Sequence, residues 1–149
     1  MGAGAVGLTS LAGCMGESES GESDTIKAAF VYDGRVGDKG WSYVQDQARQ
    51  RLEEKDWITT EFTQEVSASE GEKVIGDFAR QDYDMIFTTS VTFQDVTLNV
   101  AEQFPDQKFA NANGFNMAEN MSRYTYRYYE GRFLTGMAAG LMDDVELLG

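Results

Sequence analysis

The chain has 149 residues, of which 42% are hydrophobic, so it can form one domain with its own core but is too short for two ordinary domains. Its 25 Asp and Glu outnumber 12 Lys and Arg, and a formal net charge of -13 argues against nucleic-acid binding, because such a surface repels phosphates. Histidine is absent, which removes the commonest general base and the commonest metal ligand. The composition therefore favours a binding protein over an enzyme, with no metal and no cofactor, and its evenly spread acidic charge predicts a halophilic source.

The first residues form a small, apolar leader that ends in Leu11-Ala12-Gly13-Cys14. This ending resembles a lipobox, at which a secretory signal is cut and the new N-terminal cysteine is lipidated. Cys14 is the only cysteine, so no intrachain disulfide is possible. We expect residues 1–14 to be a lipoprotein signal, Cys14 to carry the lipid anchor, and residues 15–25 to be an acidic Gly/Ser tether. A secretory signal needs a positively charged n-region, but no Lys or Arg precedes Lys27, so either the true start lies upstream or the leader is incomplete.

Apolar, β-branched runs alternate with helical patterns along the rest of the chain. The runs predict strands over 26–32, 57–63, 84–89 and 108–112. The periodicity predicts helices over 42–55, after a capping box at 69–72, over 96–104 and over 122–142. This alternation predicts an α/β fold in which helices cover both faces of a mainly parallel sheet, with residues 26–149 forming one ligand-binding lobe.

Polar and aromatic side chains follow the predicted strands, at the edge where parallel α/β sheets bind ligands. The candidate ligand-binding residues are Asp38, Trp41, Tyr43, Ser90, Phe93 and Asp95. Aromatic faces suit a flat ring and a carboxylate accepts from N–H or hydroxyl groups, so a purine base or nucleoside is the expected ligand. Structural roles stay open: Asp38 within its own turn, Phe93 in the core, and Asp95 in a capping box with Thr92.

Several segments, taken in order, resemble the basic membrane protein family of ABC-transporter substrate-binding lipoproteins. They are Leu11 to Cys14, Gly37 to Tyr43, Tyr83 to Ser90, Val100 to Asp106 and Tyr128 to Gly136. The resemblance implies a type I periplasmic-binding-protein fold, whose two lobes close on a purine nucleoside or base. It also implies that Asp38 and Trp41 form the ligand loop and that Phe93 and Asp95 meet the base. Ser42 stands where many relatives have Asn, which leaves nucleoside or free base open.

We therefore expect the substrate-binding component of an ABC importer, which captures its purine ligand at the outer face of the cell membrane and delivers it to a permease. It would be exported and anchored by lipid on Cys14, and the second lobe of the family is expected to be missing after Gly149. Two alternatives stay open: a membrane-tethered ligand sensor and a carboxylate-based nucleoside-processing enzyme. The triplet Asn120-Met121-Ser122 also leaves N-glycosylation open.

Overall fold

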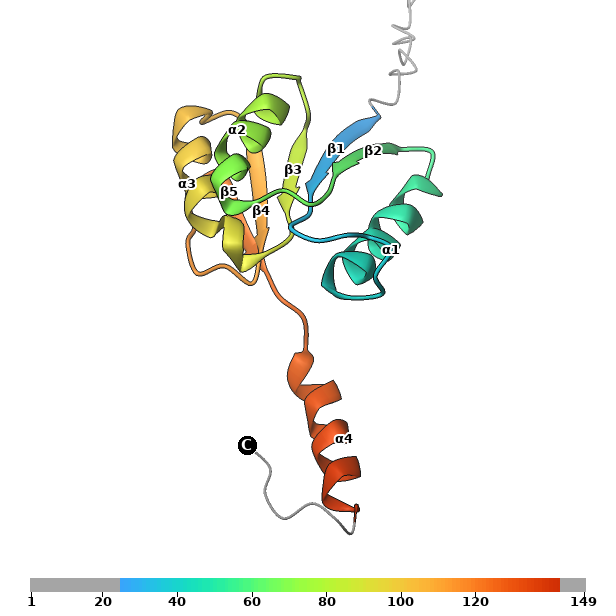
Figure 1. Cartoon of the computed structure of the whole chain (residues 1–149). Helices are drawn as coiled ribbons and strands as arrows, with labels where there is room; N and C mark the ends of the chain where they lie inside the picture. The colour runs from blue at the N-terminus through green and yellow to red at the C-terminus, as the bar shows by residue number, and fades with distance from the viewer. Residues whose placement is uncertain (1–24, 143–149) are drawn as a thin grey trace, which may run out of the picture.

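The centre of the molecule is a five-stranded parallel sheet, seen in a computed structural model that describes residues 25–142 (Figure 1). Its strands are β1 (Ile26–Val31), β2 (Ile58–Thr63), β3 (Met85–Thr88), β4 (Lys108–Ala112) and β5 (Met121–Tyr124). The strand order is β2-β1-β3-β4-β5, and every neighbouring pair runs parallel. The predicted parallel α/β fold is confirmed.

Helices pack on both faces of this sheet. α1 (Trp41–Glu53) lies on one face, whereas α2 (Ala68–Ala79) and α3 (Gln94–Gln103) lie on the other. A short 3-10 turn, η1 (Val91–Phe93), directly precedes α3. The last helix, α4 (Tyr128–Gly140), projects away from the lobe beyond the carboxyl end of β5 (Figure 1).

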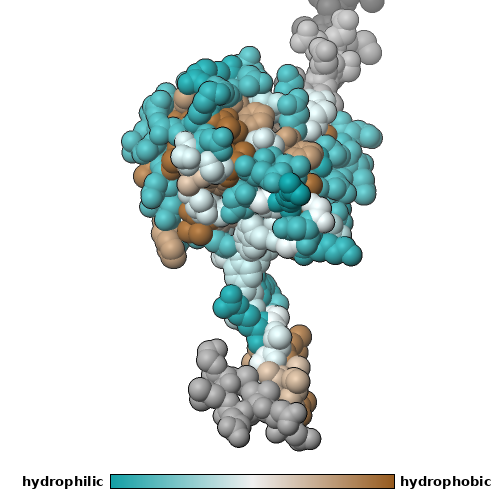
Figure 2. Space-filling view, in the orientation of Figure 1, coloured by the Kyte–Doolittle hydropathy of each residue, from teal (hydrophilic) through white to brown (hydrophobic). Residues whose placement is uncertain are grey.

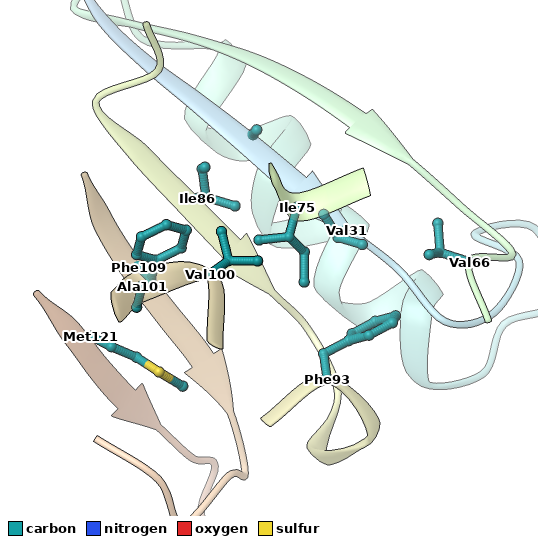
Figure 3. Close-up of a cluster of buried hydrophobic side chains, with 10 residues drawn as sticks. Val31, Val66, Ile75, Ile86, Phe93, Val100, Ala101, Phe109 and Met121 are labelled. Atoms are coloured by element: carbon teal, nitrogen blue, oxygen red, sulfur yellow. The ribbon is translucent and has the colours of Figure 1, made fainter. Parts of the chain in front are cut away.

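The main core lies between the sheet and the α2/α3 layer (Figure 3). Alternate strand residues point into it, including Val31 of β1, Ile86 of β3 and Phe109 of β4, and Ile75 and Val100 meet them from the helices. These side chains are almost completely shielded from solvent. Burial of each of these side chains contributes about 1.5–3 kcal/mol to the stability of the folded state.

The α1 face combines aromatic packing with a buried ion pair. Phe30 stacks on Phe87 with ring centroids 4.7 Å apart. Arg49 Nε donates to Asp46 Oδ1 at 2.6 Å, and its guanidinium lies 4.5 Å from the Phe62 ring centre. Because Arg49 belongs to α1 and Phe62 to β2, this contact fixes the helix against the sheet edge.

Two helices begin at other residues than predicted. The box at α2 consists of Ser67 and Glu70, two residues before the predicted one at 69–72. α1 begins at Trp41, so Ser42 lies inside the helix, where its hydroxyl accepts from the backbone N–H of Gly34 at 3.1 Å. At α2 the sequence offered both Ser67 and Ser69, and the structure uses Ser67.

The prediction of one helix over residues 122–142 is wrong. Residues Met121–Tyr124 form β5, and α4 starts only at Tyr128. The side chains of Tyr124 and Tyr126 alternate at the period of a strand, and β4 offers an open edge with which this segment pairs.

Asn120 caps the end of α3 from the loop before β5. Its side-chain N–H₂ donates to the carbonyl oxygens of Ala101, Phe104 and Gln107, each at 2.9 Å. A sugar on this nitrogen would displace these bonds, so the structure argues against N-glycosylation at Asn120.

The predicted signal, Cys14 and all of the tether except Thr25 lie outside the described residues. Within residues 25–142, no helix has both the length and the apolar composition needed to cross a bilayer.

Candidate functional site

A buried polar network shapes the turn at the carboxyl end of β3. The side-chain N–H₂ of Asn111 donates to Thr88 Oγ1 at 2.8 Å and to the carbonyl of Ser90 at 2.9 Å. Thr89 Oγ1 donates to the carbonyl of Val31 at 2.9 Å. Since these groups are buried, each bond is costly to lose, and the network holds the turn beside the end of β1.

Trp41 is anchored to this turn. It is half-buried at the start of α1, and its indole N–H donates to the carbonyl of Thr89. This bond satisfies the polar edge of the ring and sets its orientation above the ends of β1 and β3.

Three tyrosines that follow β4 along the chain extend this aromatic surface. Tyr126 meets Trp41 edge-on with ring centroids 5.7 Å apart, and Tyr128 lies 5.9 Å from Trp41 at an interplanar angle of 38°. Tyr124 meets Tyr126 edge-on at 6.2 Å. We call Trp41, Tyr124, Tyr126 and Tyr128 the aromatic cluster.

Gln45 ties the aromatic cluster to α1. Its side-chain oxygen accepts from Tyr126 Oη at 2.5 Å and from Tyr124 Oη at 3.4 Å. Its Nε2 is buried without a hydrogen-bond partner among the described residues. A donor in this position can bind an acceptor atom of a ligand or water if the cluster opens.

Burial also determines the charge of the cluster. Desolvation raises the pKa of Tyr126, with a further contribution from Tyr128, and burial raises the pKa of Tyr124 well above its ordinary value. Both phenols therefore stay neutral at physiological pH and can donate hydrogen bonds. An aromatic surface with neutral donors suits an uncharged flat ligand.

A cavity of about 580 Å³ adjoins the cluster at the ends of β4 and β5. Its lining includes Tyr124, Tyr128, Asn113 and Arg123. Asn113 has a left-handed backbone (φ 59°), and its Oδ1 accepts from the hydroxyl of Thr125 at 2.7 Å. The volume falls in the range of small-molecule sites.

Among the predicted site residues, Trp41 lies in the aromatic cluster, and Asp38 and Tyr43 lie near it in sequence. Asp38 is exposed, and its Oδ1 accepts from the N–H of Gly40 at 2.7 Å, so it stabilises its own turn. Tyr43 is half-buried on α1, and none of the ring pairs in the described chain includes it.

The turn after β3 holds the other three predicted ligand-binding residues, Ser90, Phe93 and Asp95, and their side chains have structural partners. Phe93 is completely buried in the main core (Figure 3). A methyl group added to Gly71 of α2 would lie 3.1 Å from its ring. Phe93 therefore packs as a core residue in this structure. Ser90 is buried and caps η1 by accepting from the N–H of Thr92, and Asp95 accepts from Asn116 at 2.7 Å. The structure therefore does not bring Phe93 and Asp95 against Trp41.

The sequence analysis missed Tyr124, Tyr126 and Tyr128. Their every-second-residue spacing was the available signal, but it was obscured by the helical pattern assigned to the whole of 122–142. In the part of the chain that the structure describes, no group of three metal-ligating side chains comes together.

Comparisons with known proteins agree with this architecture. The chain is 43% identical over 129 residues to a Haloferax volcanii protein with the provisional name ABC transporter glucose-binding protein TsgA13, covering 86% of this chain and 33% of that protein. It is 39% identical over 145 residues to a purine-binding protein of Brucella abortus, covering 95% of this chain and 41% of the relative. The chain thus spans well under half the length of both relatives.

A solved ABC transporter solute-binding protein from Conexibacter woesei has a similar fold. The TM-score is 0.68 at 26% identity, over 82% of this chain and 42% of that one. A family model described as ABC transporter substrate-binding protein, PnrA-like, matches residues 25–146. Because this match covers most of the chain, the protein belongs to the PnrA-like family of ABC transporter substrate-binding proteins.

Proposed function

We propose that the chain forms a ligand-binding lobe that holds a purine base or nucleoside against Trp41 and serves an ABC importer. The observation that carries this proposal is the position of the aromatic cluster: Trp41, fixed by the carbonyl of Thr89, lies at the carboxyl ends of parallel strands. Ligands of open α/β sheets bind at this edge.

The chemistry of the cluster supports a flat, uncharged ligand. A purine ring can stack on an aromatic face, and its ring nitrogens and exocyclic groups can meet neutral phenols and the amide of Gln45. The name of the Brucella relative supports a purine. The name of the Haloferax relative supports glucose instead, whose C–H face also packs on aromatic rings, so glucose is the second candidate.

The remaining parts of the proposal concern delivery. The ligand would pass to a membrane permease, and lipid on Cys14 would hold the exported protein at the outer face of the cell membrane. The tether composition and the acidic charge of -13 support exposure to a salty exterior. The lobe would act by binding and release, without catalysis.

The proposal is tested by fluorescence titration of the Trp57→Phe variant, in which Trp41 is the remaining tryptophan. Trp57 is half-exposed before β2, so this change leaves the cluster intact. We expect saturable quenching by adenosine, guanosine or hypoxanthine. Quenching by glucose alone would replace the purine with a sugar, and no response to any of these ligands would refute the proposed site.

Substitution of Trp41 gives the matching control. Trp41→Ala should weaken purine binding, followed by calorimetry, by about 1–3 kcal/mol, because stacking on a base is lost. Unchanged affinity would remove Trp41 from the site.

A further inference from the structure

Asn111 of β4 is a polar residue in the interior of the lobe. Most polar side chains lie on the surface, where Figure 2 shows hydrophilic residues in teal and water can satisfy their hydrogen bonds. Asn111 is completely shielded from solvent instead. A buried amide destabilises a fold unless its polar atoms find partners, so the contacts of Asn111 indicate what it does.

The amide N–H₂ of Asn111 holds the turn after β3 on both sides of Thr89. It donates to the carbonyl oxygen of Thr88 at 3.2 Å and to the carbonyl oxygen of Ser90 at 2.9 Å. A further contact joins it to Thr88 Oγ1 at 2.8 Å. The two peptide groups that flank the Thr89 carbonyl are therefore both fixed from β4.

The Thr89 carbonyl is the group that binds Trp41. Thr89 is also tied to β1, but its backbone N–H and its hydroxyl donate to a single acceptor, the Val31 carbonyl, at 3.1 and 2.9 Å. Two bonds to one atom fix the position of Thr89 better than the direction of its carbonyl. That direction depends on the flanking peptide groups held by Asn111, and the indole N–H follows it.

The side-chain oxygen of Asn111 faces the turn after β4. Among the described residues, no hydrogen-bond donor meets this oxygen. A methyl group added to Gly114 would lie 2.0 Å from it, so only a hydrogen atom fits in that direction. The backbone does not itself require glycine at this position, because no described glycine has a positive φ. The close approach of Asn111 is therefore the reason that residue 114 is glycine.

We propose that Asn111 is a positioning residue for Trp41, acting through the Thr89 carbonyl and depending on Gly114 for its own placement. The lobe then sets the direction of the indole before a ligand arrives, which reduces the cost of ordering the site on binding. The effect on purine affinity rests on the proposed function, whereas the effect on the orientation of Trp41 does not.

The first test follows Trp41 fluorescence without ligand, in the Trp57→Phe background. Asn111→Ala removes the donors, whereas Gly114→Ala keeps the amide but pushes it out of place. We expect both changes to shift the Trp41 emission and to increase its quenching by acrylamide, because the indole loses its fixed acceptor. Gly114→Ala decides the test by itself if Asn111→Ala does not fold, and unchanged emission in Gly114→Ala would overturn the proposal.

Asn120→Ala is the matched control for a general loss of stability. Asn120 is another amide that donates to three oxygen atoms, but these lie at the end of α3 and in the loop that follows it. Thermal melts should show a loss of stability in both Asn111→Ala and Asn120→Ala, whereas the emission should shift only in Asn111→Ala. The same shift in Asn120→Ala would mean that Asn111 has only a structural role.

The double variant Asn111→Ala/Gly114→Ala tests the contact between the two residues. Without the Asn111 amide, the nearest of the remaining atoms to a methyl group at 114 is Gln94 Cβ, at 3.2 Å. The double variant should therefore match Asn111→Ala in emission and quenching. Effects that add would show that the two residues act separately, which would refute the dependence on Gly114.

Purine titration by calorimetry separates this inference from the proposed function. Asn111→Ala and Gly114→Ala should bind adenosine, guanosine or hypoxanthine about tenfold more weakly, roughly the effect of one lost hydrogen-bonded contact. Asn120→Ala should keep the parent affinity. If the parent chain binds no purine, the proposed function fails while the emission test still decides the role of Asn111. Parent affinity in both Asn111→Ala and Gly114→Ala would show that the orientation of Trp41 does not determine binding.

Discussion

Substitution of Phe93 distinguishes a ligand contact from a core residue. The ring is completely buried, and a methyl group added to Gly71 would lie 3.1 Å from it, closer than ordinary van der Waals contact. Phe93→Ala removes this ring and leaves a cavity beneath α2 and α3. Large-to-small changes of this kind cost about 3–5 kcal/mol of the free energy of unfolding, a large share of the total for a domain of this size.

The assay is urea unfolding at high salt, followed by circular dichroism, together with purine titration of each folded variant. Phe93→Met keeps most of the side-chain volume and should cost less than about 1.5 kcal/mol. Because the ring does not reach the aromatic cluster, Phe93→Met should leave purine affinity unchanged. Trp41→Ala should show the opposite pattern, with a larger effect on binding than on unfolding.

Two results would refute this reasoning. One is a stability loss below about 1 kcal/mol for Phe93→Ala, which would mean that the ring is not part of a packed core. The other is weakened purine binding by Phe93→Met at unchanged stability, which would return Phe93 to the ligand-binding surface.

Three further predictions concern the contacts that hold the lobe together. Asp46→Ala should cost about 3 kcal/mol in urea unfolding, because it leaves the buried guanidinium of Arg49 with only its partners Glu53 and Thr60, and a loss under 1 kcal/mol would contradict this account. Stability should fall as pH rises above about 10: the unfolded chain releases the Tyr124 proton first, since burial raises the pKa of Tyr124 in the folded state, and Tyr124→Phe should flatten this alkaline slope in thermal melts. An equal slope in Tyr124→Phe would exclude Tyr124 as its source. Asn120→Ala should cost about 1–3 kcal/mol, because three carbonyl groups lose their donor, and a neutral effect in the same urea assay would show that water replaces the amide.

The sequence by itself determined the alternation of strands and helices. Buried parallel strands need continuous apolar runs such as Ala28–Tyr32, and amphipathic helices need apolar residues at helical spacing, so local composition was sufficient for β1 to β4 and for α1 to α3. It also located Trp41 at the carboxyl edge of the sheet, because a residue just after a strand and its loop must lie there.

Only the tertiary structure decided which side chains meet. Phe93 is one residue in a short turn, and its direction depends on the space left by Gly71 on α2, which no local pattern encodes. Tyr126 became a neighbour of Trp41 because residues 121–124 paired with the open edge of β4 instead of continuing a helix. Both outcomes depend on contacts between residues far apart in the chain, where packing and hydrogen bonding outweigh local propensity.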